Sequence, residues 1–202
     1  MGIRSLSSAS VATGAKRSKF WDQTTYPFEN SWESIATYSS GATGTITFNS
    51  IPSTFKYLRL VTRLRDSRSP VAYSSANIYF NGITTGYAYT WIYSDSRAGV
   101  FEDSTSGTTS IATPVPGSGV SGANIYGYGI LDIYDYANTT KFTGVQGIGG
   151  YVDPGGAYNG GEGAFDINGT WANTAVVNSI SIGANIPNFA SGVRASLYGM
   201  KG

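Results

Sequence analysis

The chain has 202 residues, of which 12% are charged and 41% are apolar, and it contains 27 glycines, 15 tyrosines and neither cysteine nor histidine. This length is typical of one domain with an appendage, and such a chain buries about 70% of its unfolded surface without a disulfide or a metal. The missing residue types exclude Ser-His-Asp and Cys-His catalysis, and zinc or copper sites built on imidazole or thiolate. Carboxylate chemistry remains open, since 12 Asp and Glu are present.

The charge content is low for a soluble domain, where about 25% of residues are usually charged. The net charge is +1, and 14% of the residues are aromatic. Protein interfaces are depleted in Lys, Glu and Asp and enriched in aromatic residues. We therefore interpret the chain as a subunit whose surface is partly covered by other subunits. No secretory signal and no membrane-spanning apolar run is expected.

Residues 1–30 are rich in Ser, Ala, Thr and Gly, and they predict an extended N-terminal arm in front of one domain over residues 31–202. Such a segment buries too little apolar surface to order by itself. We favour an arm that orders on a partner protein over a frayed terminus, and we place contact with nucleic acid well below both. The residues expected to contact the partner are Arg4, Lys16, Arg17, Lys19, Phe20 and Trp21.

Short alternating segments separated by turn residues follow the arm, and no stretch shows helical spacing over three turns. This pattern predicts an all-β domain, either a sandwich or a barrel. The predicted strands cover residues 44–49, 58–65, 77–80, 87–93, 125–134, 141–149, 164–167, 177–183 and 193–198. Asn81-Gly82 predicts a hairpin turn. The Ser-, Thr-, Gly- and Pro-rich residues 104–124 and the glycine-rich residues 153–162 predict two projecting loops.

Four aromatic residues alternate along one predicted strand, at Tyr87, Tyr89, Trp91 and Tyr93. Alternation places their rings on one face of the strand. We favour a buried core face, because aromatic residues most often pack inside. A subunit interface is the second interpretation, and a platform that stacks on sugar rings is the third.

A basic patch is predicted at Arg59, Arg63, Arg65 and Arg68, with the first three on one strand face if the strand extends that far. A solvated strand face is the favoured interpretation. Bidentate pairing with carboxylates of a neighbouring subunit is the alternative.

Acidic residues provide two weak candidate sites. Asp132 and Asp135 suggest a pair of glycosidase carboxylates, but residues three apart on a strand point to opposite faces. Oxygen ligands for calcium could come from Asp153, Asn159, Glu162 and Asp166, although their spacing matches no EF-hand loop. We therefore expect no catalytic residues, no metal and no cofactor, and we predict that the protein is not an enzyme.

The order of several segments resembles a group of small jelly-roll virion proteins and fibre tips of tailed bacteriophages, often phages of marine bacteria and cyanobacteria. The segments are ITFNSIPSTFKYLRL at 46–60, NIYFNG at 77–82, DIYDYANTTKF at 132–142, WANTAVVNSI at 171–180 and ASLYGMK at 195–201. Residues 3–6 and 14–22 resemble the arm that precedes such domains. These motifs are structural, and the resemblance carries over no active-site residue.

The resemblance implies a jelly-roll-like antiparallel β-sandwich, location on the phage particle after synthesis in the host cytoplasm, and self-association. We expect a capsid decoration or cement subunit that forms a homotrimer and contacts the major capsid protein through its arm. The alternative is a tail fibre or receptor-binding protein whose partner is a host surface glycan.

Overall fold

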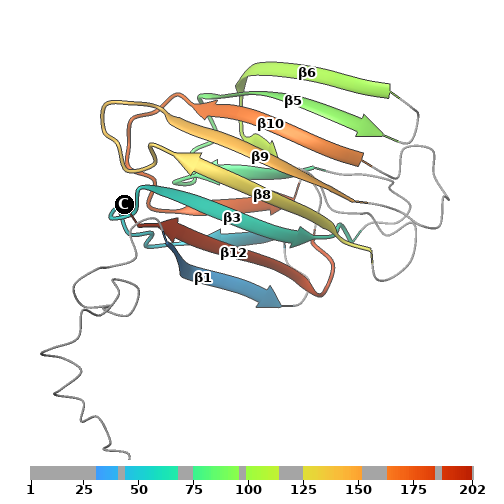
Figure 1. The fold of residues 1–202 in the computed structure, drawn as a ribbon, viewed down its shortest axis with the longest axis horizontal. Coiled ribbons are helices and arrows are strands. Elements are labelled where there is room, and N and C mark those ends of the chain that lie inside the picture. The colour runs from blue at the N-terminus through green and yellow to red at the C-terminus, as the bar shows by residue number, and fades with distance from the viewer. Residues whose placement is uncertain are drawn as a thin grey trace, which may run out of the picture.

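The computed structural model describes residues 31–40, 44–67, 75–95, 99–113, 125–151, 163–184 and 188–201. These residues form an all-β, jelly-roll-like sandwich of two antiparallel sheets, as predicted (Figure 1). The strands are β1 (Trp32–Ser40), β2 (Thr45–Phe48), β3 (Tyr57–Leu64), β4 (Ala76–Phe80), β5 (Tyr87–Asp95), β6 (Gly99–Thr108), β7 (Ile111–Thr113), β8 (Gly127–Tyr134), β9 (Thr143–Tyr151), β10 (Gly163–Trp171), β11 (Ile180–Ala184) and β12 (Val193–Met200). The predicted arm, with all six of its named residues, lies outside the described residues.

The two sheets differ in width. The larger sheet has eight strands in the order β1-β12-β3-β8-β9-β10-β5-β6, and the smaller has four in the order β2-β11-β4-β7. In Figure 1 the larger sheet faces the viewer and the smaller sheet lies behind it. From β1 to β5 the chain alternates between the sheets, whereas β8, β9 and β10 form a meander within the larger one. Strands that follow each other along the chain from β1 to β5 therefore lie in opposite sheets.

The core fills the space between these inner faces. Along β3 the even-numbered residues are buried and the odd-numbered ones are half-exposed, which confirms the predicted period of two. Leu58 and Leu60 from the larger sheet and Ile46, Ile78 and Ile182 from the smaller are fully buried. Burial of one such side chain stabilises the fold by about 1.5–3 kcal/mol. The two sheets are therefore held together mainly by aliphatic contacts.

Gly199 gives one part of this core its shape. It lies on β12 opposite Leu58 of β3, and the Phe55 ring occupies the space where a Cβ would stand. Only a residue without a side chain allows that ring to approach the strand so closely. Phe55 itself is held from the other side, because its N–H donates to the Tyr136 hydroxyl at 3.1 Å. A close backbone approach thus anchors the segment between β2 and β3.

Two buried tyrosine hydroxyls connect turns to the core. The Tyr136 hydroxyl donates to the Pro52 carbonyl at 2.6 Å in addition to accepting from Phe55. The Tyr87 hydroxyl accepts from the Phe80 N–H at 2.8 Å and donates to the Ile83 carbonyl at 3.0 Å. Both rings are almost fully buried. Each hydroxyl satisfies backbone groups that would otherwise be desolvated without a partner.

The hairpin predicted at Asn81-Gly82 is wrong, although the turn exists. Asn81 and Gly82 have φ values of 54° and 67°, and the Ile83 N–H donates to the Phe80 carbonyl at 2.9 Å. The turn connects β4 of the smaller sheet to β5 of the larger one instead of two paired strands. The Asn81 side chain explains the difference, since its carboxamide bonds the backbone of residues 176, 178 and 179, just before β11. These bonds fix the turn as a corner between the sheets.

The loop predicted over residues 104–124 is also wrong in its first half. Residues 104–108 complete β6, residues 111–113 form β7, and residues 114–124 lie outside the described residues. β6 is an edge strand bonded only to β5 among the described strands, so it needs few apolar side chains. Gly107, at φ 65°, is the extra residue of a bulge between the Tyr87–Thr108 and Ala88–Ser106 pairs.

The remaining differences are small. No range was predicted for β1, whose serine- and threonine-rich sequence resembles a turn. The strand predicted at 141–149 is observed as β9, which extends to residue 151. The strand predicted at 164–167 is observed as β10, which extends to residue 171. The glycine-rich loop predicted at 153–162 lies outside the described residues.

The Phe55–Gly199 contact predicts opposite effects of one substitution at two strand glycines. Gly199→Ala places a methyl group against the Phe55 ring and should lower the free energy of unfolding by about 1–3 kcal/mol. Gly144→Ala is the matched control, because its Cβ would meet only Tyr134 Cβ at 4.0 Å. We expect the control to be neutral or stabilising by about 0.5–1 kcal/mol in urea unfolding. Equal effects at both positions would contradict the proposed clash.

The buried Tyr87 hydroxyl predicts loss of stability in alkali. Burial raises the pKa of Tyr87 from 10.0 to about 12. The raised value means that this contribution is complete below pH 10 and is lost as the pH rises toward 12, because the unfolded chain loses its proton first. Tyr87→Phe should cost about 1–3 kcal/mol near neutral pH and should flatten the decline above pH 10. Denaturant unfolding at several alkaline pH values tests this. An unchanged slope in the variant would contradict it.

Candidate ligand-binding and assembly face

The candidate site lies on the face of the larger sheet that points away from the smaller sheet, which we call the outer face. Antiparallel pairing places its side chains in rows that run across the strands. In one row Arg59 of β3 lies opposite Asp132 of β8, followed by Gln146 of β9 and Asn168 of β10. The next row contains Val61, Ile130, Ile148, Asp166 and Ile92. Each row therefore brings together side chains from several strands.

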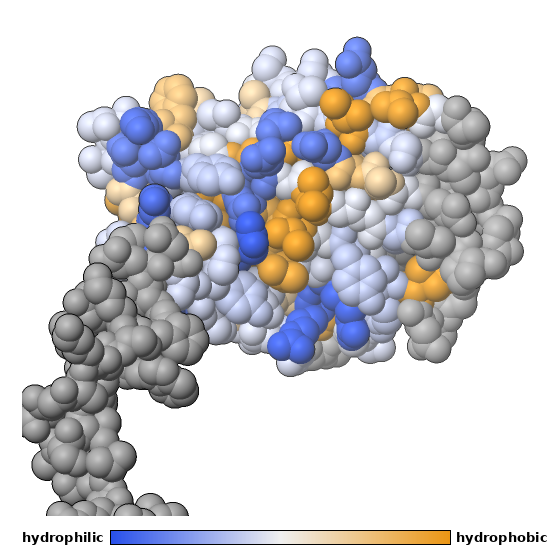
Figure 2. Space-filling view, in the orientation of Figure 1, coloured by the Kyte–Doolittle hydropathy of each residue, from blue (hydrophilic) through white to orange (hydrophobic). Residues whose placement is uncertain are grey.

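Large apolar side chains are exposed along the second row and beside it. Ile148 is 57% exposed and Val100 is 76% exposed. The set, which we call the apolar band, consists of Val61, Ile92, Val100, Tyr128, Ile130 and Ile148. Figure 2 shows orange side chains gathered in the middle of this face, with blue side chains beside them. The outer face of a two-layer sandwich is usually polar, and a contiguous apolar patch marks an interaction surface.

Opposite charges flank the apolar band. Arg63 of β3 and Arg194 of β12 are neighbours at one side of the sheet. Glu102 of β6 lies beyond Ile92 at the other side, and Asp166 of β10 stands within the row, between Ile148 and Ile92. Two copies of this face could bring the basic side of one against the acidic side of the other.

Arg59 and Asp132 form a bidentate ion pair across β3 and β8. Arg59 Nε donates to Asp132 Oδ1 at 2.6 Å, and a terminal nitrogen donates to Oδ2 at 2.7 Å. The guanidinium also lies 4.4 Å from the Trp32 ring centroid. The hydrogen bond to Asp132 raises the pKa of Arg59 above its ordinary value. Arg59 thus pairs within its own chain, which differs from the predicted alternative of pairing with a neighbouring subunit.

Asp132 and Asp135, the two candidate glycosidase carboxylates, have different partners. Asp135 follows the end of β8 with φ 53°, and its carboxylate lies 3.7 Å from the Lys141 ammonium. Asp132 is held by Arg59 on the outer face. The geometry therefore places the two carboxylates in separate ion pairs.

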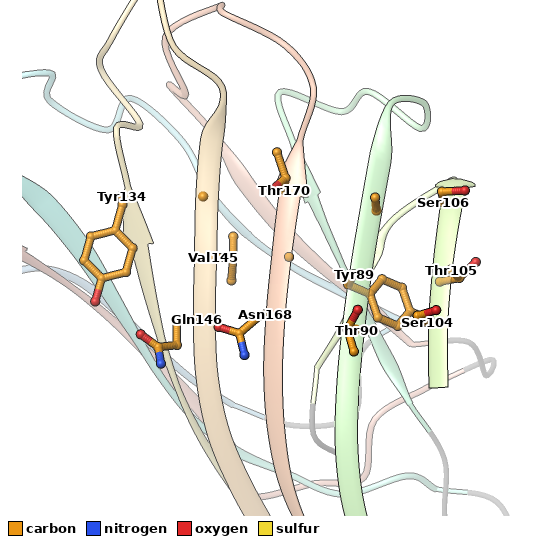
Figure 3. Close-up of a pocket in the computed structure, with 13 residues that line it drawn as sticks. Tyr89, Thr90, Ser104, Thr105, Ser106, Tyr134, Val145, Gln146, Asn168 and Thr170 are labelled. Carbon is orange, nitrogen blue, oxygen red and sulfur yellow. The ribbon is translucent and has the colours of Figure 1, made fainter. Parts of the chain in front are cut away.

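A hollow of about 610 Å³ opens on the outer face beside the apolar band. It spans β8, β9, β10, β5 and β6, as Figure 3 shows, with Tyr134 at one side and the β6 side chains at the other. Its polar side chains are hydroxyls and carboxamides from Thr90, Ser104, Ser106, Gln146, Asn168 and Thr170. No charged residue is among the described residues that line it. The hollow is an open, uncharged trough.

Tyr134 forms the wall of the hollow and is held by other rings. Its centroid lies 5.5 Å from that of Tyr57, which packs edge-on against Trp32 at 5.3 Å. Partial burial raises the pKa of Tyr134, and the Asp132 carboxylate raises it further. A side-chain hydrogen bond with Asp132 adds to this rise, so the hydroxyl already has a partner on its own strand. The ring is 37% exposed and can contact a ligand.

The predicted aromatic row lies on the inner side of β5, where its first three residues contact the core. Tyr87 is buried and stacks on Trp171 with centroids 6.1 Å apart, so it is not available as an interface or ligand residue. Tyr89 and Trp91 are partly buried and pack against the core. Tyr93 extends the row, with its ring 5.2 Å from that of Phe101. Tyr89 also lines the hollow, together with Ala88 and Thr90 of the same strand.

The predicted basic patch is only partly present. Arg63 is half-buried over the Tyr126 ring, and Arg68 lies outside the described residues. Arg65 does not share the strand face, because β3 ends at Leu64 and Arg65 is buried. Its carbonyl accepts from the Ala190 N–H at 2.8 Å.

The predicted calcium ligands receive no support from the described part of the chain. Asp153, Asn159 and Glu162 lie outside it, whereas Asp166 accepts from the Asn168 side chain at 3.2 Å. Among the described residues, no three His, Cys, Asp or Glu side chains are grouped as metal ligands. None of the described segments is a helix of the length and apolarity needed to span a membrane.

Of the residues that line the hollow, the sequence interpretation named only Tyr89 as a possible ligand residue. Gln146, Asn168 and Thr170 occupy alternate positions on β9 and β10, where the pattern of polar residues between buried ones was the available signal. Thr90 and Ser104 are partners across β5 and β6. This pair was not expected, because β6 was not among the predicted strands. The hollow depends on register across five strands.

No family model, curated protein or solved structure matches the chain. Function is therefore inferred from the geometry of the outer face, together with the resemblance in sequence.

Proposed function

We propose that this protein is a non-enzymatic structural subunit of a bacteriophage particle that associates with copies of itself as a trimer. The capsid decoration or cement subunit is the first candidate. In that role the arm, through Phe20, Trp21 and its basic residues, contacts the major capsid protein or another virion protein. No cofactor, membrane or nucleic acid takes part.

The apolar band is the observation that carries the proposal. A sandwich whose inner faces already pack against each other does not need Ile130, Ile148 and Ile92 on its outer face for folding. A second copy of the chain covers the band best, since the charges at its two sides are opposite and the net charge is only +1. Contact of the band with the same band of a second copy is isologous and gives a two-fold dimer, so a trimer needs contacts beyond the band. This supports a cyclic homo-oligomer.

Substitution of the band should weaken self-association. The double variant Ile130→Thr with Ile148→Thr keeps β-branched residues, so the sheet should fold while apolar contact area is lost. We expect the dissociation constant of the oligomer to rise about tenfold or more, measured by analytical ultracentrifugation. Phe142→Ser is the matched control, because Phe142 is 53% exposed but precedes β9 outside the band. A stable monomer of the unaltered chain would refute the proposal.

Copy number and position in the particle distinguish the two virion roles. Decoration of the head predicts hundreds of copies spread over the capsid, whereas a tail protein predicts only a few per particle. Quantitative mass spectrometry of purified particles, with labelling in electron micrographs, measures both. Absence from particles would refute both roles.

A receptor-binding or fibre protein of the tail is the second candidate. The hollow favours it, because an open polar trough with an aromatic wall is suited to a surface glycan. The two candidates share the self-associating band and differ in what the remaining surface contacts.

A further inference from the structure

We propose that the hollow on the outer face binds a neutral saccharide, with Tyr134 stacking on a sugar ring and the side chains of β9, β10, β5 and β6 bonding its hydroxyls. This assigns a ligand class to the second candidate role. The chemistry does not depend on whether the subunit sits on head or tail.

The lining matches a ligand rich in hydroxyls. Gln146 and Asn168 are direct partners across β9 and β10, and Figure 3 shows their side chains next to each other. A carboxamide both donates and accepts, as do the hydroxyls of Thr170, Thr90 and Ser104. Such groups pair with sugar hydroxyls, which are themselves both donors and acceptors. A purely apolar ligand would leave them desolvated without partners.

The electrostatics favour a neutral ligand. Arg59 lies two strands from Gln146 in the same row and is already engaged by Asp132 at 2.6 Å. An anionic sugar would find no free cation among the described residues of the lining. A cationic ligand would find no free carboxylate there either. The hollow thus distinguishes neutral from charged saccharides.

The shape fits a short saccharide. A volume of about 610 Å³ falls within the 300–1,000 Å³ typical of small-molecule sites. The trough extends over five strands and is open to solvent, so a chain of sugar units can continue beyond it. Any side chain at position 144 would project into the open space beside Tyr134. Because Gly144 has none, the trough stays deep there.

The Tyr134 ring is prepared for stacking. Its contact with Tyr57, and that of Tyr57 with Trp32, restrict its rotation before a ligand arrives. A preordered ring loses less side-chain freedom on binding. Its hydroxyl is hydrogen-bonded to Asp132, which restrains the ring further.

The test titrates the full chain with maltose, cellobiose and lactose, and with sialyllactose as a charged probe, followed by saturation-transfer NMR and calorimetry. We expect millimolar binding of at least one neutral disaccharide. Tyr134→Leu should weaken it about tenfold, through loss of ring stacking. Phe142→Leu is the matched control, since Phe142 is an exposed aromatic residue just before β9 that lies outside both the band and the hollow.

A second pair of variants tests the trough itself. Gly144→Val should fill it and abolish binding without unfolding the sheet, whereas Ala164→Val creates the same side chain on the outer face of β10 away from the hollow and should leave binding unchanged. No binding of any neutral disaccharide, binding of sialyllactose alone, or equal loss in variant and control would each overturn the proposal. Self-association, measured separately, tests the structural role whatever the sugar result.

Discussion

Contact between the inner faces of two sheets of unequal width determines where every other feature of this protein can lie. Leu60, Leu131 and Ile133 of the larger sheet must meet Ile46, Ile78 and Ile182 of the smaller one. Because side chains alternate along a strand, this requirement directs the intervening residues to the outer face. A register slip of one residue would bury Arg59 and Asp132 and expose the leucines. The outer face therefore depends on the core for its composition.

The outer face divides its two properties between the ends of its strands. The apolar band includes Tyr128 near the start of β8, whereas the hollow begins at Tyr134 at its end. Tyr128 and Tyr134 lie about 20 Å apart along β8. Ile148 of the band and Gln146 of the hollow are only two residues apart on β9, however, which is about 6–7 Å. A partner seated on the band would therefore border the trough.

Local patterns in the sequence sufficed for the fold class and for most strands. The alternation of Leu58, Leu60 and Leu64 with arginines placed β3 and its buried face correctly. The Asn81-Gly82 turn was identified, but its role as a corner depends on bonds from Asn81 to residues about a hundred positions away. The strand β6 was missed because an edge strand can be built from Ser, Thr and Gly. Backbone pairing with β5 stabilises this strand, although its composition is not typical of a strand.

The candidate site was less accessible to sequence reasoning. Tyr87, Tyr89 and Trp91 formed the conspicuous pattern, yet inward-facing aromatic residues serve the core. Gln146, Asn168 and Thr90 form the trough only because three separate strands share one register. Polar residues at solvent-facing positions of a strand are common, so the local sequence does not indicate that these side chains lie together.

The bare backbone at Gly144 makes the outer face open to evolutionary change. Its immediate surroundings are empty, in contrast to Gly199, which supports the Phe55 ring. A single base change in the gene could therefore introduce a side chain there and remodel the contour of the surface. The interior would keep its arrangement, so variation in what this surface recognises can accumulate without loss of the scaffold.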